Sequence, residues 1–263
     1  MKTTVITLKE MKTRGEKIAV LTAYDCPTAR IMDECGVDCI LVGDSVGNVL
    51  LGFDNTIPVT VGDMIHHGKA VCRGVKNALV IIDMPFMSYQ ISPEDAVRNA
   101  GRIVKETGCN AVKLEGGAEA VRAITAITAA GIPVCGHVGL TPQSVNALGG
   151  YRVQGKGEAA AEELLSAAKS VEAAGAFAIV LECVPAELAH SITKTLTIPT
   201  IGIGAGAFTD GQVLVGQDIL GFAEKPAKFV KQYADVASAM KEAFLRYKDE
   251  VKGGEFPDEQ RSF

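Results

Sequence analysis

The chain has 263 residues, and its 28 glycines exceed the ~7 % share that is usual in proteins. With 48 % hydrophobic and 22 % charged residues and no long charge block, it is globular, which excludes intrinsic disorder. A net charge of −5 without a basic, aromatic-rich cluster excludes a nucleic-acid binder, and no apolar stretch approaches the ~20 residues of a membrane span. The polar first segment, with Glu10 and Glu16, resembles no secretory signal, so we expect a cytoplasmic protein.

Eight short apolar runs recur along the chain. They are rich in Val and Ile and apolar on both faces, which is typical of parallel strands covered by helices. We expect strands at residues 18–23, 39–43, 78–82, 111–115, 132–137, 177–182, 198–203 and 218–222.

Helical patterns alternate with these runs. Ser92 and Pro93 open one of them, and Gly108, Gly131 and Gly175 close others. We expect helices at residues 27–35, 60–74, 93–107, 118–130, 157–174, 186–194 and 226–250, with a short turn at 211–217.

Eight strand–helix units without a linker predict one α/β domain over residues 1–263, a (β/α)8 TIM barrel. An open, doubly wound sheet uses the same alternation and remains the alternative, because periodicity does not determine whether the sheet closes.

Polar side chains stand where the expected strands end, and in a barrel these ends meet at one mouth. Side chains two residues apart share a face, so Lys113 and Glu115 should point the same way. Carboxylates that converge need a cation or a shared proton, and oxygen ligands favour Mg²⁺, which predicts a site on Asp44 and Asp83. Each aspartate alone could instead cap a helix or a turn, and Lys113 could extend to solvent.

Two glycine-rich segments suggest phosphate binding. Residues 150–157 nearly match a nucleotide phosphate loop, but Gly157 replaces the hydroxyl residue that holds the metal, so we reject nucleotide hydrolysis. Residues 202–206 follow an expected strand, where either tight packing or an anion site fits.

Six longer motifs in the same order resemble one enzyme family, the 3-methyl-2-oxobutanoate (ketopantoate) hydroxymethyltransferases, over residues 22–221. They are LVGDSVGNVLLG from Leu41, DMPFMSY from Asp83, VKLEGG from Val112, PVCGHVGLTPQSVNALGGYRVQGKG from Pro133, VLECVP from Val180 and IPTIGIGAG from Ile198.

The resemblance implies a barrel of the phosphoenolpyruvate/pyruvate type. It implies transfer of a one-carbon unit from 5,10-methylenetetrahydrofolate to 3-methyl-2-oxobutanoate through an enolate that Mg²⁺ stabilises, giving 2-dehydropantoate on the route to pantothenate. It also implies a homo-oligomer, often a decamer. By the family's motifs, the metal ligands are Asp44, Asp83 and Glu115, the oxo-acid-binding residues are Asp44, Ser45, Asp83, Lys113 and His137, and the proton acceptor is Glu182.

The segment from Gln217 to Phe229 departs from the family pattern, and no short motif marks the folate-binding residues. Two other classes of function share the same predicted fold. One is a Mg²⁺-dependent aldolase or lyase that uses a free aldehyde without folate, and the other is a non-catalytic barrel that binds a ligand or a partner.

Overall fold

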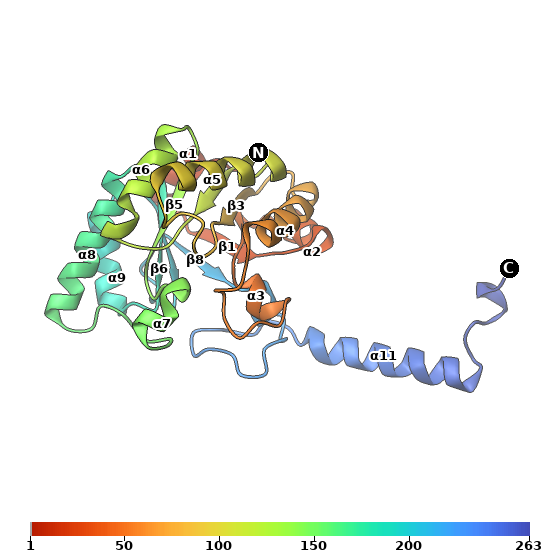
Figure 1. Ribbon diagram of the computed structural model, residues 1–263. Helices are drawn as coiled ribbons and strands as arrows, with labels where there is room; N and C mark the ends of the chain where they lie inside the picture. Colours follow the sequence, from red (N-terminus) through yellow and green to blue (C-terminus); the bar gives the residue numbers. More distant parts are fainter. Residues whose placement is uncertain (1) are drawn as a thin grey trace. The chain divides into compact units, whose positions relative to one another are not determined.

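The computed structural model describes residues 2–263, which form two compact units that meet in sequence between Val215 and Gly216. The first unit contains eight parallel strands that pair in chain order and close into a barrel (Figure 1). Closure comes from β8 pairing with β1, where Ile18 lies opposite Gly211. The expected (β/α)8 barrel is confirmed, and the open, doubly wound alternative is wrong. The strands are β1 (Ile18–Thr22), β2 (Cys39–Val42), β3 (Leu79–Asp83), β4 (Ala111–Lys113), β5 (Val134–Gly139), β6 (Ala178–Glu182), β7 (Thr200–Ile203) and β8 (Gly211–Leu214).

Helices surround the strands and begin and end close to the expected residues. Thr60 caps α4 through a capping box, and Ser92 with Pro93 begins α5. The longer helices of this unit are α1 (Val5–Arg14), α2 (Cys26–Glu34), α4 (Val61–Gly74), α5 (Pro93–Thr107), α6 (Val121–Ala129), α8 (Glu158–Ala173) and α9 (Ala186–Thr195), and the short ones are α3 (Val46–Val49), η1 (Ala118–Ala120), η2 (Pro142–Ser144) and α7 (Val145–Leu148).

Helix α1 has no counterpart among the expected elements. Its Leu8 and Met11 are buried against barrel residues such as Val20 and Ile81. Only Leu8 and Met11 of its ten residues are buried, so its apolar residues do not recur with a helical period that the sequence analysis could detect. Packing of this helix completes the apolar layer inside the barrel, beneath the polar residues of the mouth.

The eighth strand lies earlier than expected. The apolar run at 218–222 is not a strand, because Asp218 and Ile219 belong to the short helix α10 (Gly216–Ile219). The true strand, β8, contains Gln212 and only two buried residues, so it lacks the apolar run of the other strands. Gly211 is needed there because a Cβ at this position would collide with the carbonyl oxygen of Ile18 on β1.

Gly139, at the end of β5, lies against the strand that carries Glu182. Its φ is +100°, and a Cβ there would collide with the carbonyl oxygen of Glu182. We expect Gly139→Ala to lower the free energy of unfolding by about 2–3 kcal/mol, through backbone strain and overpacking. Gly101→Ala, in helix α5, is the control, because the added Cβ meets open space. Its free energy of unfolding should rise by up to about 1 kcal/mol. Chemical denaturation measures both, and equal stability of the two variants would contradict the prediction.

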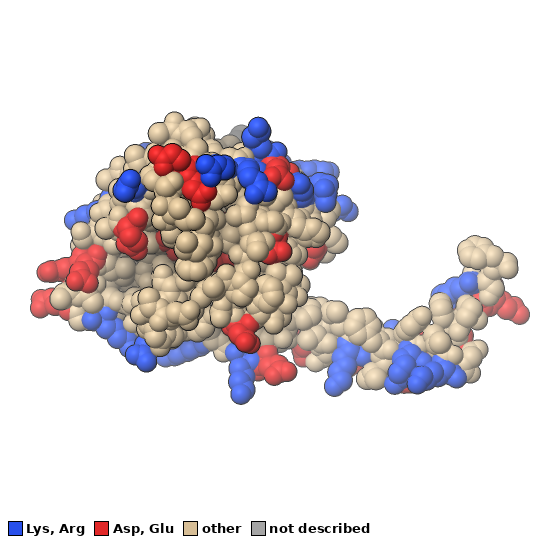
Figure 2. Space-filling view, in the orientation of Figure 1, with Lys and Arg blue, Asp and Glu red and all other residues tan. Residues whose placement is uncertain are grey.

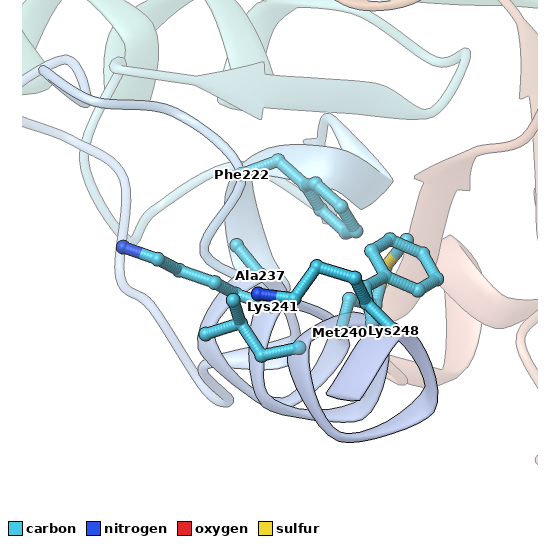
Figure 3. A pocket seen from close by; sticks show the side chains of 7 residues that line it. Phe222, Ala237, Met240, Lys241 and Lys248 are labelled. Carbon is cyan, nitrogen blue, oxygen red and sulfur yellow. The ribbon is translucent and has the colours of Figure 1, made fainter. Parts of the chain in front are cut away.

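The second unit spans Gly216–Phe263 and contains α10, α11 (Val236–Gly253) and η3 (Glu259–Arg261). The helix expected at 226–250 begins ten residues later, where the Asp235 side chain accepts a hydrogen bond from the Ser238 N–H and caps it. None of the residues of α11 is buried. A groove of about 410 Å³ runs along its apolar side (Figure 3), lined by Phe222, Ala237, Met240, Lys241, Phe244, Leu245 and Lys248.

Among residues 2–263, no helix combines the length and the apolar character that crossing a bilayer requires. On the face shown in Figure 2, acidic and basic side chains are interspersed among uncharged ones.

Candidate active site

Five neighbouring strands direct polar side chains into the mouth of the barrel. Asp44 follows β2, Asp83 ends β3, Lys113 ends β4, His137 lies in β5 and Glu182 ends β6. The first four are at most 4 % exposed, and the Glu182 side chain is 16 % exposed. Both aspartates lie inside the barrel mouth and cap no helix, and Lys113 does not extend to solvent. The alternative roles considered for these three residues are therefore wrong.

Asp44, Asp83 and Lys113 form one side of this cluster. The Asp44 N–H donates to Asp83 Oδ2 at 3.0 Å, and Lys113 Nζ lies 2.7 Å from Asp83 Oδ1. Burial, followed by the charges of Asp83 and Glu115, holds the pKa of the Asp44 carboxyl well above its usual range. Burial alone would lower the pKa of Lys113, but the carboxylates around it raise it, so Lys113 is a buried cation.

Glu115, His137 and Glu182 form the other side. His137 Nδ1 lies 3.5 Å from Glu115 Oε1, and its Nε2 lies 3.3 Å from Glu182 Oε2. A β-bridge between Gly116 and His137 turns the chain after β4 back against β5 and brings Glu115 to the imidazole. As expected from their spacing, Lys113 and Glu115 both face the mouth, where each contacts His137. The imidazole therefore stands between two carboxylates.

The charge of His137 depends on these carboxylates. Burial and the Lys113 ammonium lower its pKa, but Glu115 and Glu182 outweigh them and raise the pKa to about 9. In return, although burial opposes it, the pKa of the Glu115 carboxyl is lowered by His137 and Lys113. At neutral pH the site thus contains an imidazolium between two acidic side chains.

This arrangement predicts a pH dependence of stability. Because the pKa of His137 is raised above its unfolded value of about 6.5, its contribution is fully present below pH 6.5 and is lost as the pH rises through about 9. We expect the NMR titration of His137 in the metal-free protein to have its midpoint near pH 9. His137→Asn should remove the loss of stability between pH 6.5 and 9. A midpoint near 6.5 would contradict the proposed charge state.

Gln143 links the two sides and was missed from the sequence. Its Nε2 donates to Asp44 Oδ2 and to the Met84 carbonyl oxygen at 2.9 Å, and its backbone N–H donates to Glu115 Oε2 at 3.0 Å. Tyr89, also missed, places its hydroxyl 2.8 Å from Gln143 Oε1. Gln143 lies in the three-residue helix η2 and Tyr89 in the loop after β3, and neither segment is long enough for a period to mark a buried side chain. The only available signals were the two family motifs that contain these residues, DMPFMSY for Tyr89 and the motif from Pro133 for Gln143.

Ser45 lies at the edge of the cluster, where its Oγ is 2.8 Å from the Tyr24 hydroxyl. The glycines of residues 202–206 serve packing at least in part, because a Cβ on Gly202 would meet Thr209 Oγ1 at 2.6 Å. A role in anion binding stays a prediction.

The side chains present fit a divalent cation bound by two carboxylates. Asp44 and Asp83 are adjacent and buried, and Asp83 Oδ1 makes no hydrogen bond of good geometry within the described chain. No cluster of three or more His, Cys, Asp or Glu residues in the described part of the chain is arranged to hold a metal. Both oxygens of Glu115 already face His137 and Gln143. A hard ion that completes its shell with water and substrate oxygens, as Mg²⁺ does, matches this donor set.

A closed barrel with acids, a buried ammonium and an imidazolium at the carboxyl ends of its strands defines an enzyme of the α/β-barrel class. The sequence model of the family described as ketopantoate hydroxymethyltransferase matches residues 2–259. The chain belongs to this family.

Curated relatives that match this chain over nearly their whole length are named 3-methyl-2-oxobutanoate hydroxymethyltransferase. The 3-methyl-2-oxobutanoate hydroxymethyltransferase of Clostridium novyi (strain NT) is 59 % identical over 264 residues, covering 100 % of this chain and 96 % of the relative. That of Enterococcus faecalis (strain ATCC 700802 / V583) is 58 % identical with the same coverage. Among solved structures, 2,3-dimethylmalate lyase, a member of the PEP mutase/isocitrate lyase superfamily, has a TM-score of 0.62 at 17 % identity, covering 100 % of this chain and 92 % of that one. This structural likeness shows the barrel fold.

Proposed function

We propose that the chain transfers a hydroxymethyl group from 5,10-methylenetetrahydrofolate to 3-methyl-2-oxobutanoate, giving 2-dehydropantoate in the first step of pantothenate biosynthesis. The relatives' names and the family match support the hydroxymethyl transfer. The observation that carries the chemistry is the row of Glu115, His137 and Glu182 beside the buried Lys113, because it combines a proton acceptor with positive charge.

Glu182 accepts the C3 proton of the oxo acid. It is the most exposed of these carboxylates, so a substrate in the mouth can reach it, and its Oε2 lies 3.3 Å from His137 Nε2. The resulting enolate carbon forms a bond to the methylene carbon of the folate. Water then supplies the hydroxyl group of the product as the last carbon–nitrogen bond breaks, and tetrahydrofolate leaves with the proton on its nitrogen. Lys113 and Ser45 face the oxo acid, and Lys113 compensates its negative charge.

Asp44 and Asp83 would hold Mg²⁺, which supplies Lewis-acid charge to the oxygens of the oxo acid when it is bound. Gln143 fixes the Asp44 carboxyl for this role. We propose that Glu115 contributes through water or through His137, since both of its oxygens have protein partners.

Product formation with each one-carbon donor tests the proposal. The chain should form 2-dehydropantoate from 3-methyl-2-oxobutanoate only when methylenetetrahydrofolate is supplied. Turnover with free formaldehyde alone, at the same rate, would instead make the protein a folate-independent aldolase.

We also propose that the chain assembles into a homo-oligomer, as large as a decamer, in the cytoplasm. Exposed apolar side chains on α11 support assembly, because an exposed apolar face of this kind marks an interface with another protein surface. Phe244 is 64 % exposed and Leu245 is 46 % exposed. Sedimentation of the purified protein as a monomer would contradict it.

A further inference from the structure

A second cavity lies beside the mouth, between the chain segments that follow β4 and β5 and the helix α8. Its volume is about 550 Å³, within the roughly 300–1,000 Å³ of pockets that bind organic ligands. The cavity near Tyr89 and Arg122 measures about 220 Å³ and falls below this range. The walls of the larger one are mostly small residues with a few polar groups, including Gly117, Glu119, Thr141, Ala160, Glu163 and Ala167.

This cavity adjoins the strand that carries Glu182. Gly139, which lines it, lies opposite Glu182 in the pairing of β5 with β6. Gln154, another lining residue, donates its backbone N–H to the carbonyl oxygen of Cys183 at 2.9 Å. Gly139 therefore lies against Glu182, the proposed proton acceptor, and Gln154 contacts Cys183, the residue that follows it.

One glycine-rich loop, residues 149–157, contributes Gln154 and Gly155 to the lining of the cavity. Gly149, Gly150, Gly155 and Gly157 all have positive φ, between 66° and 113°, and Gly155 lines the cavity. On the same loop, Tyr151 has a side chain that is 58 % exposed. Burial, followed by the charges of Asp44 and Glu182, raises the pKa of Tyr151. The Tyr151 phenol therefore lies within the electrostatic field of the carboxylates in the mouth.

We propose that this cavity binds the folate co-substrate, with the pterin ring between the 149–157 loop and α8, an inference that rests on the proposed function. The 2-amino-4-oxo edge of a pterin presents neighbouring N–H donors that a carboxylate accepts in pairs. Glu163 provides that carboxylate, since Glu119 Oε1 already accepts the Gly117 N–H. Small residues such as Ala160 and Ala167 admit a flat ring, and Tyr151, on the same loop as Gln154 and Gly155, offers an aromatic face.

A pair of variants on one turn of α8 tests the proposal. Ala160 lines the cavity, whereas its neighbour Ala159 is exposed and does not. We expect Ala160→Leu to weaken the binding of tetrahydrofolate, measured by titration calorimetry, at least tenfold and to raise the KM for methylenetetrahydrofolate. The KM for the oxo acid and the exchange of its C3 proton should not change, and Ala159→Leu should behave as the parent.

A second pair of variants tests whether the effect of Ala160→Leu comes only from disturbed packing of α8. Glu163→Gln should weaken tetrahydrofolate binding at least threefold, and Glu162→Gln, one residue away and exposed, should leave it unchanged. Parental affinity in both Ala160→Leu and Glu163→Gln would overturn the proposal. Failure of the proposed function would differ, because the parent protein itself would then neither exchange the C3 proton nor bind tetrahydrofolate.

Discussion

Glu182→Gln lowers the rate at which the C3 proton of 3-methyl-2-oxobutanoate exchanges in deuterated water by about 10²–10⁴-fold, the usual contribution of a positioned general base. The amide keeps the size of the side chain but has no basic oxygen to accept the proton. The matched control is Glu187→Gln, an exposed residue at the start of α9, which should exchange at the parental rate.

Exchange is followed by NMR without any folate, so the result concerns proton removal alone. If Glu182→Gln exchanged the proton as fast as the parent, Glu182 would not be the base. Binding of the oxo acid should change little, since Lys113 and Ser45 remain. A large rise in its dissociation constant with unchanged exchange at saturation would reassign Glu182 to substrate binding.

The second large effect is expected from Asp83→Asn. Asp83 pairs with Lys113 at 2.7 Å, and both side chains are at most 5 % exposed. Removing the Asp83 charge leaves the buried Lys113 ammonium without the carboxylate it pairs with, which costs about 3–5 kcal/mol of unfolding free energy. Titration with Mn²⁺ as a probe of the cation site should also show at least tenfold weaker binding than in the parent.

Two comparisons separate the charge effect from a general loss of structure. Glu106→Gln breaks an exposed pair with Lys69 and should cost less than about 1 kcal/mol. Adding Lys113→Met to Asp83→Asn removes the stranded cation and should recover part of the lost stability. A double variant less stable than Asp83→Asn would show that the buried cation is not the cause.

Much of the fold was predictable because most strands carry an uninterrupted apolar run and most helices carry local end signals. Helix α5 lies at the expected residues since Ser92, Pro93 and Gly108 fix both of its ends. Strand β8 was placed wrongly because its burial comes from close approach at Gly211, and contact with a distant strand leaves no periodic signal.

The site was predictable to a similar extent and for a similar reason. Strand ends indicated that Asp44, Asp83, Lys113, His137 and Glu182 would meet, and they do. The spacing of residues did not reveal that His137 stands between Glu115 and Glu182, because that contact depends on the β-bridge at Gly116. Gln143 was missed since its role comes from contacts that η2 makes with Asp44 and Glu115, which are distant in the sequence.

In the proposed function, the side chains of the barrel mouth remove the C3 proton of a 2-oxo acid with the help of a divalent cation. The most direct measurement is C3 deuterium exchange of 3-methyl-2-oxobutanoate by the parent protein, with Mg²⁺ and after complete chelation, in the absence of folate. We expect rapid exchange with Mg²⁺ and a loss of at least a hundredfold after chelation. Equal exchange under both conditions, or none under either, would contradict it.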